Sequence, residues 1–257
     1  MPKAKIEWCD YTINPVKGLC PMACPYCYAR RMYKRFKWNP EIRFEPEVFE
    51  GLCSIGMDNP SKIFVGSTIE LFCDEIPPEW LKVIFKWCGG FFTEHTFIFL
   101  TKQPHNLIKW SPFPDNCWVG VSVTANGDMT NAYYGLNRVQ AGKRFISFEP
   151  LLGQIGFDDH VKMKSYVDWV IIGSQTPYSP KTAPRIEWVQ EIVAAADKVG
   201  IPVFLKNNLV PIIAGNKSFK EADPMFIYKD GGYYTLRQEL PNKLSENKGV
   251  VYLQSQV

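Results

Sequence analysis

The chain has 257 residues, of which 46% are hydrophobic and 21% are charged, and its formal net charge is +3. These values are near those of globular domains and exclude a disordered chain, and the longest apolar runs are too short to cross a bilayer. The length fits one large domain or a domain with a small appendage, and α/β barrels commonly have this size.

The number of cysteines indicates the compartment of the protein, and the positive charges are concentrated near the amino end. Eight cysteines without an apolar leader after Met1 are typical of a reducing compartment rather than of a disulfide framework. Residues 1–45 hold nine lysines or arginines against four aspartates or glutamates, and five of these positive charges lie between Arg30 and Lys37. We therefore expect a cytoplasmic protein with no membrane partner.

The first elements expected along the chain are short. A strand is predicted near Tyr11 to Asn14, and a turn-rich segment then leads into a cysteine-rich loop. The stretch Tyr28 to Lys37 has good helix formers and neither glycine nor proline, so it predicts a helix directly after that loop. A further helix is predicted from Pro46 to Cys53, with the proline at an early helical position.

The cysteine-rich loop contains Cys20, Cys24 and Cys27, with the spacing C-x3-C-x2-C and an aromatic residue, Tyr26, before the last cysteine. Three thiolates on one loop can hold three corners of a cubane cluster and leave the fourth iron open to a small molecule. This motif resembles that of the radical SAM superfamily. The resemblance implies a 4Fe-4S cluster on the three cysteines, S-adenosyl-L-methionine chelated to the fourth iron, and Tyr26 beside the adenine. It also implies one-electron cleavage of the cofactor to methionine and a 5'-deoxyadenosyl radical, with a flavodoxin or ferredoxin as electron donor.

Two alternatives remain open at this point. The three cysteines are also compatible with a structural zinc site completed by Cys9, in a non-catalytic protein that binds nucleic acid. Zinc sites more often pair two separated C-x2-C knuckles, and the sequence shows no second knuckle. The other alternative is a barrel that binds the cluster but has lost turnover.

From Lys62 onward, short apolar runs alternate with longer helical stretches. Continuous apolarity is typical of strands buried on both faces, and the alternation predicts parallel βα units with right-handed crossovers. The predicted strands cover 63–66, 97–100, 118–122, 145–148, 169–172 and 203–205, and the predicted helices cover 78–88, 128–140 and 186–199. Together with the strand before the cysteines, they give an α/β fold with a partial (β/α)6 barrel over residues 1–210, the architecture that the resemblance also implies.

Residues 211–257 are expected to form a small C-terminal extension. Phe226 to Leu236 predicts a β-hairpin around Asp230-Gly231. The polar residues 237–249 are expected to form a lid or a cap.

In parallel βα folds, site residues collect where the strands end. Ser67, Thr68 and Glu70 follow the first of the predicted strands, where the superfamily usually has a Gly-Gly-Glu turn that holds the methionine amino group. Ser122 ends the third strand and Thr124 follows it, and their hydroxyls suit contacts with the ribose. All of these positions are also compatible with ordinary helix caps.

The remaining candidates are charged residues and one thiol. Glu149 directly follows an apolar strand, where a carboxylate needs a polar cavity or a partner, so we expect it to bind the cofactor or substrate or to pair with a buried lysine or arginine. Lys102 and Lys206 follow two other strands and are candidate ligands for a substrate carboxylate or phosphate. Cys73 lies on a loop after the first strand exit and is a candidate hydrogen-atom donor.

Several short motifs narrow the resemblance to a radical SAM subgroup found in phages and prophages. They lie at residues 8–15, 27–29, 99–102, 120–123 and 148–153, and the similarity runs through residues 6–210. That subgroup tends to have a Gly-Gly-Glu-Ser-Gly turn after its sixth strand, whereas this chain has Gly173-Ser174-Gln175. The turn of this chain therefore lacks the glutamate and any role that the glutamate has in the subgroup. The resemblance implies cofactor and initiation chemistry but no substrate.

The basic and aromatic run at residues 30–37 suits phosphates and stacked bases, so the substrate expected is a nucleotide or a nucleic acid. The alternative for this run is a solvated helix face, and a peptide or small metabolite remains open as substrate.

Overall fold

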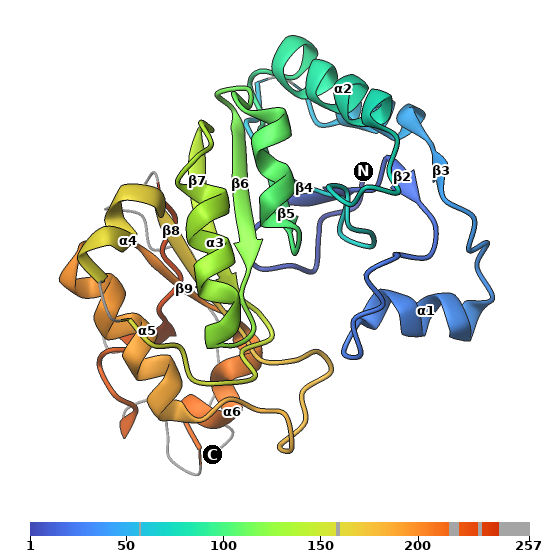
Figure 1. The fold of residues 1–257 in the computed structure, drawn as a ribbon. Helices are drawn as coiled ribbons and strands as arrows, with labels where there is room; N and C mark the ends of the chain where they lie inside the picture. Colours follow the sequence, from blue (N-terminus) through green and yellow to red (C-terminus); the bar gives the residue numbers. More distant parts are fainter. Residues whose placement is uncertain (57, 158–159, 216–220, 231–232, 242–257) are drawn as a thin grey trace. The chain divides into compact units, whose positions relative to one another are not determined.

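The computed structural model describes residues 1–257 except 57, 158–159, 216–220, 231–232 and 242–257 (Figure 1). The strands are β1 Tyr11–Ile13, β2 Val16–Lys17, β3 Arg43–Phe44, β4 Lys62–Val65, β5 Thr96–Thr101, β6 Cys117–Ser122, β7 Lys143–Phe148, β8 Trp169–Ile172, β9 Val203–Leu205, β10 Ile227–Asp230 and β11 Tyr233–Leu236. The α-helices are α1 Tyr28–Phe36, α2 Pro78–Lys86, α3 Met129–Leu136, α4 His160–Tyr166, α5 Ile186–Lys198 and α6 Val210–Ile213. Short 3-10 helices cover Pro46–Ser54, Pro104–Trp110, Asn126–Asp128 and Asn207–Leu209, and a π-helical turn covers Trp87–Phe91.

Seven strands form one sheet in the order β1-β4-β5-β6-β7-β8-β9. The β1/β4, β4/β5, β5/β6 and β8/β9 pairs are parallel. Among the described residues the strand order begins with β1 and ends with β9. Every strand predicted from an apolar run is present within two residues of its expected bounds, and the strand expected before the cysteines is β1.

Continuous burial along the sheet explains why apolar runs marked these strands. All six residues of β6 are buried, and the residues of β8 are buried as well. Gly120, in β6, makes room for an aromatic neighbour, because a Cβ at this position would come within 2.3 Å of the Phe145 ring. A strand of this kind has no solvent-facing side, so its sequence shows no alternation.

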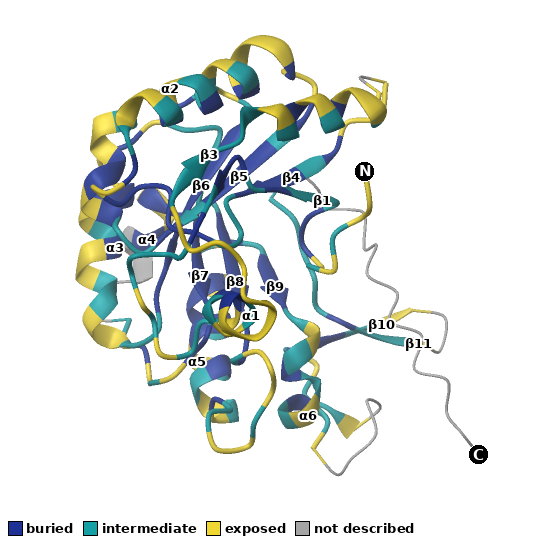
Figure 2. Cartoon of the chain, turned by 90° about the vertical axis from the view of Figure 1, so that its right-hand side faces the viewer, coloured by how far each residue is buried: buried dark blue, intermediate teal, exposed yellow. Residues whose placement is uncertain are grey.

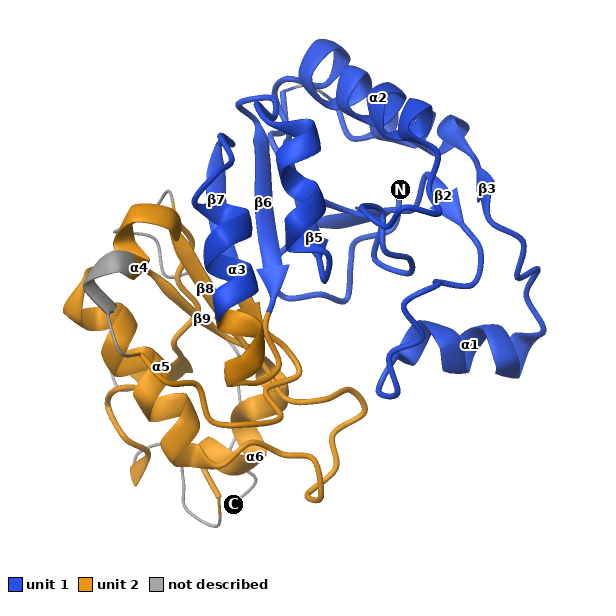
Figure 3. Cartoon of the chain, in the orientation of Figure 1, with its two compact units in different colours: residues 1–122, 130–145 blue, residues 123–129, 146–257 orange. Residues whose placement is uncertain are grey.

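The chain divides into two compact units (Figure 3). One comprises residues 1–122 and 130–145, and the other comprises residues 123–129 and 146–257. Figure 2 shows helices that are buried on one side and exposed on the other. In the first unit α2 buries Leu81 and Ile84, and in the second unit α5 buries Val189, Ile192 and Val193. This pattern is the expected one for helices that cover a sheet.

Three predicted helices differ from their expected form. The segment that begins at Pro46 is a 3-10 helix rather than an α-helix, and its buried residues Phe49 and Leu52 lie three positions apart, the spacing at which 3-10 side chains eclipse. The helix expected over 78–88 ends at Lys86 and continues as the π-helical turn. There Gly89 passes close to Pro114, and a Cβ on this glycine would lie 2.7 Å from the proline ring. The helix expected over 128–140 covers only Met129–Leu136.

The C-terminal segment pairs with itself and with the sheet edge. β10 and β11 pair antiparallel, with Ile227 opposite Leu236, while the expected turn at residues 231–232 lies outside the described residues. Residues 237–239 run along β9: the Leu205 N–H donates to the Arg237 carbonyl at 2.8 Å, and the Glu239 N–H donates to the Val203 carbonyl at 3.0 Å. The rest of the expected lid, from residue 242, lies outside the described part of the chain. None of the described helices combines the length and apolarity that a bilayer crossing requires.

Candidate active site

The three motif cysteines lie on the loop between β2 and α1, and each thiol is free of disulfide bonds and partly exposed. Ala23 takes a positive φ of 48°, which turns the chain between Cys20 and Cys24. Cys27 caps α1, and its sulfur accepts the Arg30 N–H at 3.4 Å. The predicted helix directly after the loop is therefore present, and it begins from the last cysteine itself.

Two of the three sulfurs accept hydrogen bonds from backbone amides. Besides the Arg30 contact to Cys27, the Glu70 N–H donates to the Cys20 sulfur at 3.4 Å. Burial raises the pKa of the Cys20 thiol, and the Glu70 carboxylate and Cys27 raise it further, while the backbone amides lower it. Amide donors of this kind stabilise thiolate ligands when a metal draws the proton away.

The donor set fits a cluster bound through one loop. A single zinc ion holds sulfur at about 2.3 Å and so gathers its ligands around one point, whereas a cubane distributes its thiolates over separate irons. Among the described residues, no group of three or more His, Cys, Asp or Glu side chains, the three motif cysteines included, is gathered closely enough to be recognised as a metal site. Cys9, the fourth ligand of the zinc alternative, is buried, and its thiol donates to the Ile6 carbonyl at 3.9 Å. Three free thiols on one loop, two with amide donors, form a donor set that fits a cluster.

The exit of β4 is joined to the exit of β1 through Asn14. The Asn14 Oδ1 atom accepts hydrogen bonds from Ser67 Oγ at 3.1 Å and from the N–H and hydroxyl of Thr68, each at 3.2 Å. The Tyr28 hydroxyl, on α1, donates to the Ser67 carbonyl at 2.8 Å. Asn14 is not among the predicted site residues, although its place in Asn-Pro directly after β1 is a signal that the sequence offers.

Glu70 lies buried between the exits of β4 and β5. Its carboxylate accepts the Thr101 hydroxyl at 2.7 Å, the Lys102 N–H at 2.7 Å and the Phe72 N–H at 3.0 Å. Burial raises the pKa of this carboxyl, against the lowering effect of its hydrogen bonds and of the Lys102 charge. The carboxylate predicted as a cofactor ligand thus holds two strand exits together, and its backbone N–H reaches the cysteine loop.

Lys102 contacts two other predicted site residues. Its ammonium donates to the Ser122 hydroxyl at 3.1 Å and lies 6.0 Å from the centre of the Tyr26 ring. Next to it, the Gln103 amide contacts the Met22 sulfur at 2.8 Å. The first unit therefore brings the cysteine loop, the β5 exit and the β6 exit together, as expected for residues at the carboxyl ends of parallel strands.

Cys73 is buried behind the same exit. Its thiol donates to the Glu70 carbonyl at 3.1 Å, and burial raises its pKa to about 12, with Glu75 and Glu70 adding to the rise. The sulfur therefore keeps its proton in the physiological range. Its role as a hydrogen-atom donor stays a prediction.

The second unit holds the other predicted residues. The Thr124 N–H and hydroxyl both donate to the Asp128 carboxylate at 2.8 Å, which is the helix-start contact that the alternative interpretation expects. Glu149 forms an ion pair with Lys206, and their side chains are 21% and 12% exposed. The two residues, predicted separately, are thus partners of each other.

Gly173, at the exit of β8, makes room for this pair. A Cβ on Gly173 would lie 2.9 Å from Lys206 Cδ and 3.3 Å from Glu149 Cδ. The next residue, Ser174, is fully buried, and its hydroxyl has no hydrogen-bond partner among the described residues. The resembling subgroup tends to have a glutamate-containing turn after this strand. In this chain the turn begins at Gly173 and packs against the carboxylate of Glu149, which directly follows β7.

Comparison with solved structures supports the fold. A Cys-to-Ser mutant of spore photoproduct lyase is 12% identical, with a TM-score of 0.56 over 80% of this chain and 81% of that chain. A double mutant of spore photoproduct lyase with bound AdoMet and dinucleoside spore photoproduct is 12% identical, with a TM-score of 0.48 over 73% of this chain and 63% of that chain. The first likeness confirms the expected α/β class with a partial barrel of the radical SAM type.

Sequence comparisons place the chain in a family. No curated protein matches it. Residues 3–210 match the family described as "Protein of unknown function (DUF5131)", a span that includes the cysteine loop and every strand of the seven-stranded sheet. The chain therefore belongs to the DUF5131 family.

Proposed function

We propose that this protein is a radical SAM enzyme in which Cys20, Cys24 and Cys27 hold a 4Fe-4S cluster and S-adenosyl-L-methionine occupies the remaining iron. The observation that carries the proposal is the set of three free thiols on one loop, two of them with backbone amide donors, in a chain with this fold. When bound, the cluster supplies the electron that cleaves the cofactor, and the resulting radical removes a hydrogen atom from the substrate.

The residues around the loop have separate tasks in this proposal. Cys27 holds the start of α1 in place, and Arg30 donates from its Nη2 atom to the Cys20 carbonyl at 2.6 Å, which fixes the two ends of the loop. Lys102 orients the Ser122 hydroxyl, and because this oxygen accepts from an ammonium its own proton stays available for the cofactor ribose. Tyr26, beside Lys102, offers a flat face to the adenine.

The finer parts of the proposal depend on the sequence. The motif C-x3-C-x2-C-Y-A supports a place in the phage and prophage subgroup. The basic run on α1 supports a nucleotide or nucleic acid as substrate, and a flavodoxin or ferredoxin as electron donor suits a cytoplasmic enzyme.

The test is anaerobic reconstitution of the full chain with iron and sulfide, followed by S-adenosyl-L-methionine and dithionite. We expect the iron and sulfide content of one cubane and release of 5'-deoxyadenosine. Cys24→Ala should abolish both, whereas Cys53→Ala, which changes an exposed thiol outside the loop, should change neither.

Cys9→Ser distinguishes the cluster from the zinc site. It should leave the iron content intact, because Cys9 is not one of the three ligands. Purified protein that carries one zinc ion and loses it in Cys9→Ser would refute the proposal.

A further inference from the structure

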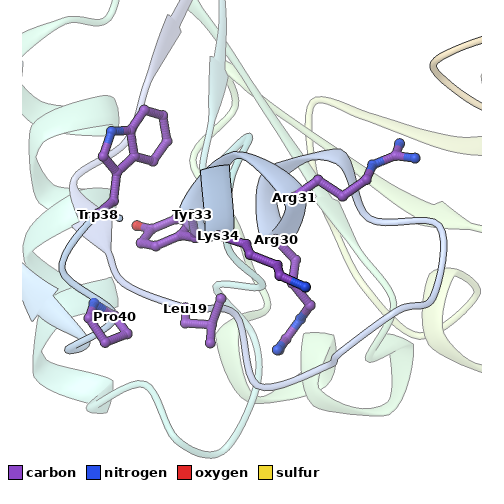
Figure 4. Close-up of a pocket in the computed structure, with 7 residues that line it drawn as sticks. All are labelled: Leu19, Arg30, Arg31, Tyr33, Lys34, Trp38 and Pro40. Atoms are coloured by element: carbon purple, nitrogen blue, oxygen red, sulfur yellow. The ribbon is translucent and has the colours of Figure 1, made fainter. Parts of the chain in front are cut away.

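A pocket of about 410 Å³ lies beside α1 (Figure 4). Its lining residues are Leu19, Arg30, Arg31, Tyr33, Lys34, Trp38 and Pro40. Leu19 precedes the first motif cysteine, so the pocket and the proposed cluster site share one segment of chain.

The pocket has an aromatic side with a fixed geometry. Lys37 ends α1 in the left-handed conformation, with φ of 52°, and the Trp38 N–H returns to the Tyr33 carbonyl at 3.2 Å. The Trp38 ring lies edge-on to the ring of Tyr33, with centroids 5.3 Å apart, and stacks on Phe36 at 5.6 Å. Tyr33 is anchored in turn, because its hydroxyl accepts the Gly18 N–H at 2.8 Å. Trp38 nevertheless remains 43% exposed. An exposed indole held this firmly is a ready surface for stacking.

The other side of the pocket is cationic. Arg30, Arg31 and Lys34 contribute three positive charges, and none of the seven lining residues is an aspartate or glutamate. The Lys34 ammonium, in the last turn of α1, forms neither a hydrogen bond nor an ion pair with the described residues. The buried Nε atom of Arg30 also has no hydrogen-bond partner among them, although the Nη2 atom of the same guanidinium donates to Cys20. Three cations and no acidic residue in the lining suit an anionic ligand.

An apolar aromatic wall next to a cationic rim matches a ligand that carries both a planar ring and negative charge. Nucleic-acid binding sites for single strands combine these two features, because bases stack on aromatic side chains while the backbone follows basic residues. An acidic protein partner would use the charges but not the concave aromatic surface. The observations therefore favour a nucleotide unit over an electron-donor protein.

We propose that this pocket binds one nucleotide of a single-stranded nucleic acid, with the base against Trp38 and a phosphate on Lys34. As an identification of the substrate, this inference rests on the proposed radical SAM function. As a statement about binding, it is independent of the cluster, because no lining residue is a proposed cluster ligand.

The experiment measures binding of a fluorescent oligothymidylate of about ten nucleotides to the full, anaerobically purified chain, without S-adenosyl-L-methionine or reductant. Lys34 and Arg35 form a matched pair: they are neighbours in the last turn of α1, both are exposed, and only Lys34 lines the pocket. Lys34→Glu should weaken binding about tenfold. It should also make the slope of log affinity against log salt concentration shallower, by about the amount that one phosphate contact contributes. Arg35→Glu makes the same change of charge and should have a much smaller effect.

Two further variants test the aromatic wall. Trp38→Ala should weaken binding about fivefold or more, and Trp38→Phe should recover most of the loss, because stacking depends on a ring face. Circular dichroism of each variant confirms that it is folded.

Each outcome decides between the alternatives. Equal losses in Lys34→Glu and Arg35→Glu, or full affinity in Trp38→Ala, would show only non-specific attraction and would refute the pocket. A defect in reduction by flavodoxin with unchanged oligonucleotide affinity would assign the surface to the electron donor instead. If wild-type protein releases no 5'-deoxyadenosine yet Lys34→Glu and Trp38→Ala lose affinity, the proposed function fails while the pocket stands. If wild-type protein releases 5'-deoxyadenosine and none of the variants changes binding, the pocket fails while the proposed function stands.

Discussion

The carboxylate of Glu70 accepts the backbone N–H of Lys102 at 2.7 Å, so the residue that follows β4 holds in place the residue that follows β5. Lys102 then reaches Ser122 at the end of β6. Three strand exits are thus joined in series, and the first of them also donates an amide to the Cys20 sulfur. The cysteine loop therefore rests on a hydrogen-bonded framework rather than on an isolated turn.

Glu70→Ala should lower the free energy of unfolding by about 3 kcal/mol. The variant leaves the Thr101 hydroxyl, the buried Phe72 N–H and the partly buried Lys102 N–H without their acceptor, and unsatisfied buried donors cost more than the net value of their bonds. Urea unfolding of the metal-free chain measures the change. Glu50→Ala, at an exposed position, is the control and should stay within about 0.5 kcal/mol of wild type. A loss below about 1 kcal/mol for Glu70→Ala would contradict the framework.

Stability at alkaline pH should depend on Cys73. Its folded-state pKa of about 12 lies above the ordinary value of 9.0, so the folded chain keeps a proton that the unfolded chain loses. The resulting stability is fully present below pH 9.0 and is lost as the pH rises toward 12.

Unfolding of wild type and Cys73→Ala at about pH 8 and about pH 10 checks this dependence, since the advantage of wild type should shrink by about 1 kcal/mol between them. Cys53→Ala, at an exposed thiol, should show no such difference. A constant gap between wild type and Cys73→Ala would count against the assigned pKa shift.

Glu149 and Lys206 should show strong energetic coupling. Both side chains are largely buried, so removal of one partner leaves an unpaired charge, and either Glu149→Gln or Lys206→Met should cost about 2 to 3 kcal/mol. The double variant should cost clearly less than the sum, with a coupling energy of about 1 kcal/mol or more in a double-mutant cycle. Additive effects would mean that the pair contributes little, and a loss of 5'-deoxyadenosine release without loss of stability would favour the ligand role for Glu149.

Gly173→Ala tests the space around this pair. The added Cβ would lie 2.9 Å from Lys206 and 3.3 Å from Glu149, so the two side chains have to shift, at a cost of about 1 to 3 kcal/mol. Gly127→Ala is the matched control in the same unit, because nothing lies within 4 Å of its Cβ position. Thermal unfolding of both variants gives the comparison. Equal melting temperatures for the two would show that the pair does not fill this space.

Much of this fold is predictable from local pattern. Strands buried on both faces show continuous apolar runs, which is why the predicted bounds of β4 to β9 lie within two residues of the observed ones. Helices are less well bounded where proline and glycine intervene: the run that begins at Pro46 is a 3-10 helix, and the Gly89-Gly90 pair ends α2 in a π-helical turn. The short helix α4 and the β2/β3 pair have weak periodicity and are not predicted.

The sequence by itself determined which residues stand at the carboxyl ends of parallel strands and that three thiols share one loop, because both follow from order along the chain. Only the tertiary structure decided how those residues are used. Glu70 accepts hydrogen bonds from a neighbouring exit, Glu149 is paired with Lys206, and Trp38 turns back beside α1 to complete a basic pocket. These contacts join residues that are distant in sequence, or residues that a turn in the chain brings back together. Hydrogen bonds and ion pairs depend on distances of a few ångströms, and the spacing of residues along the sequence does not specify such distances.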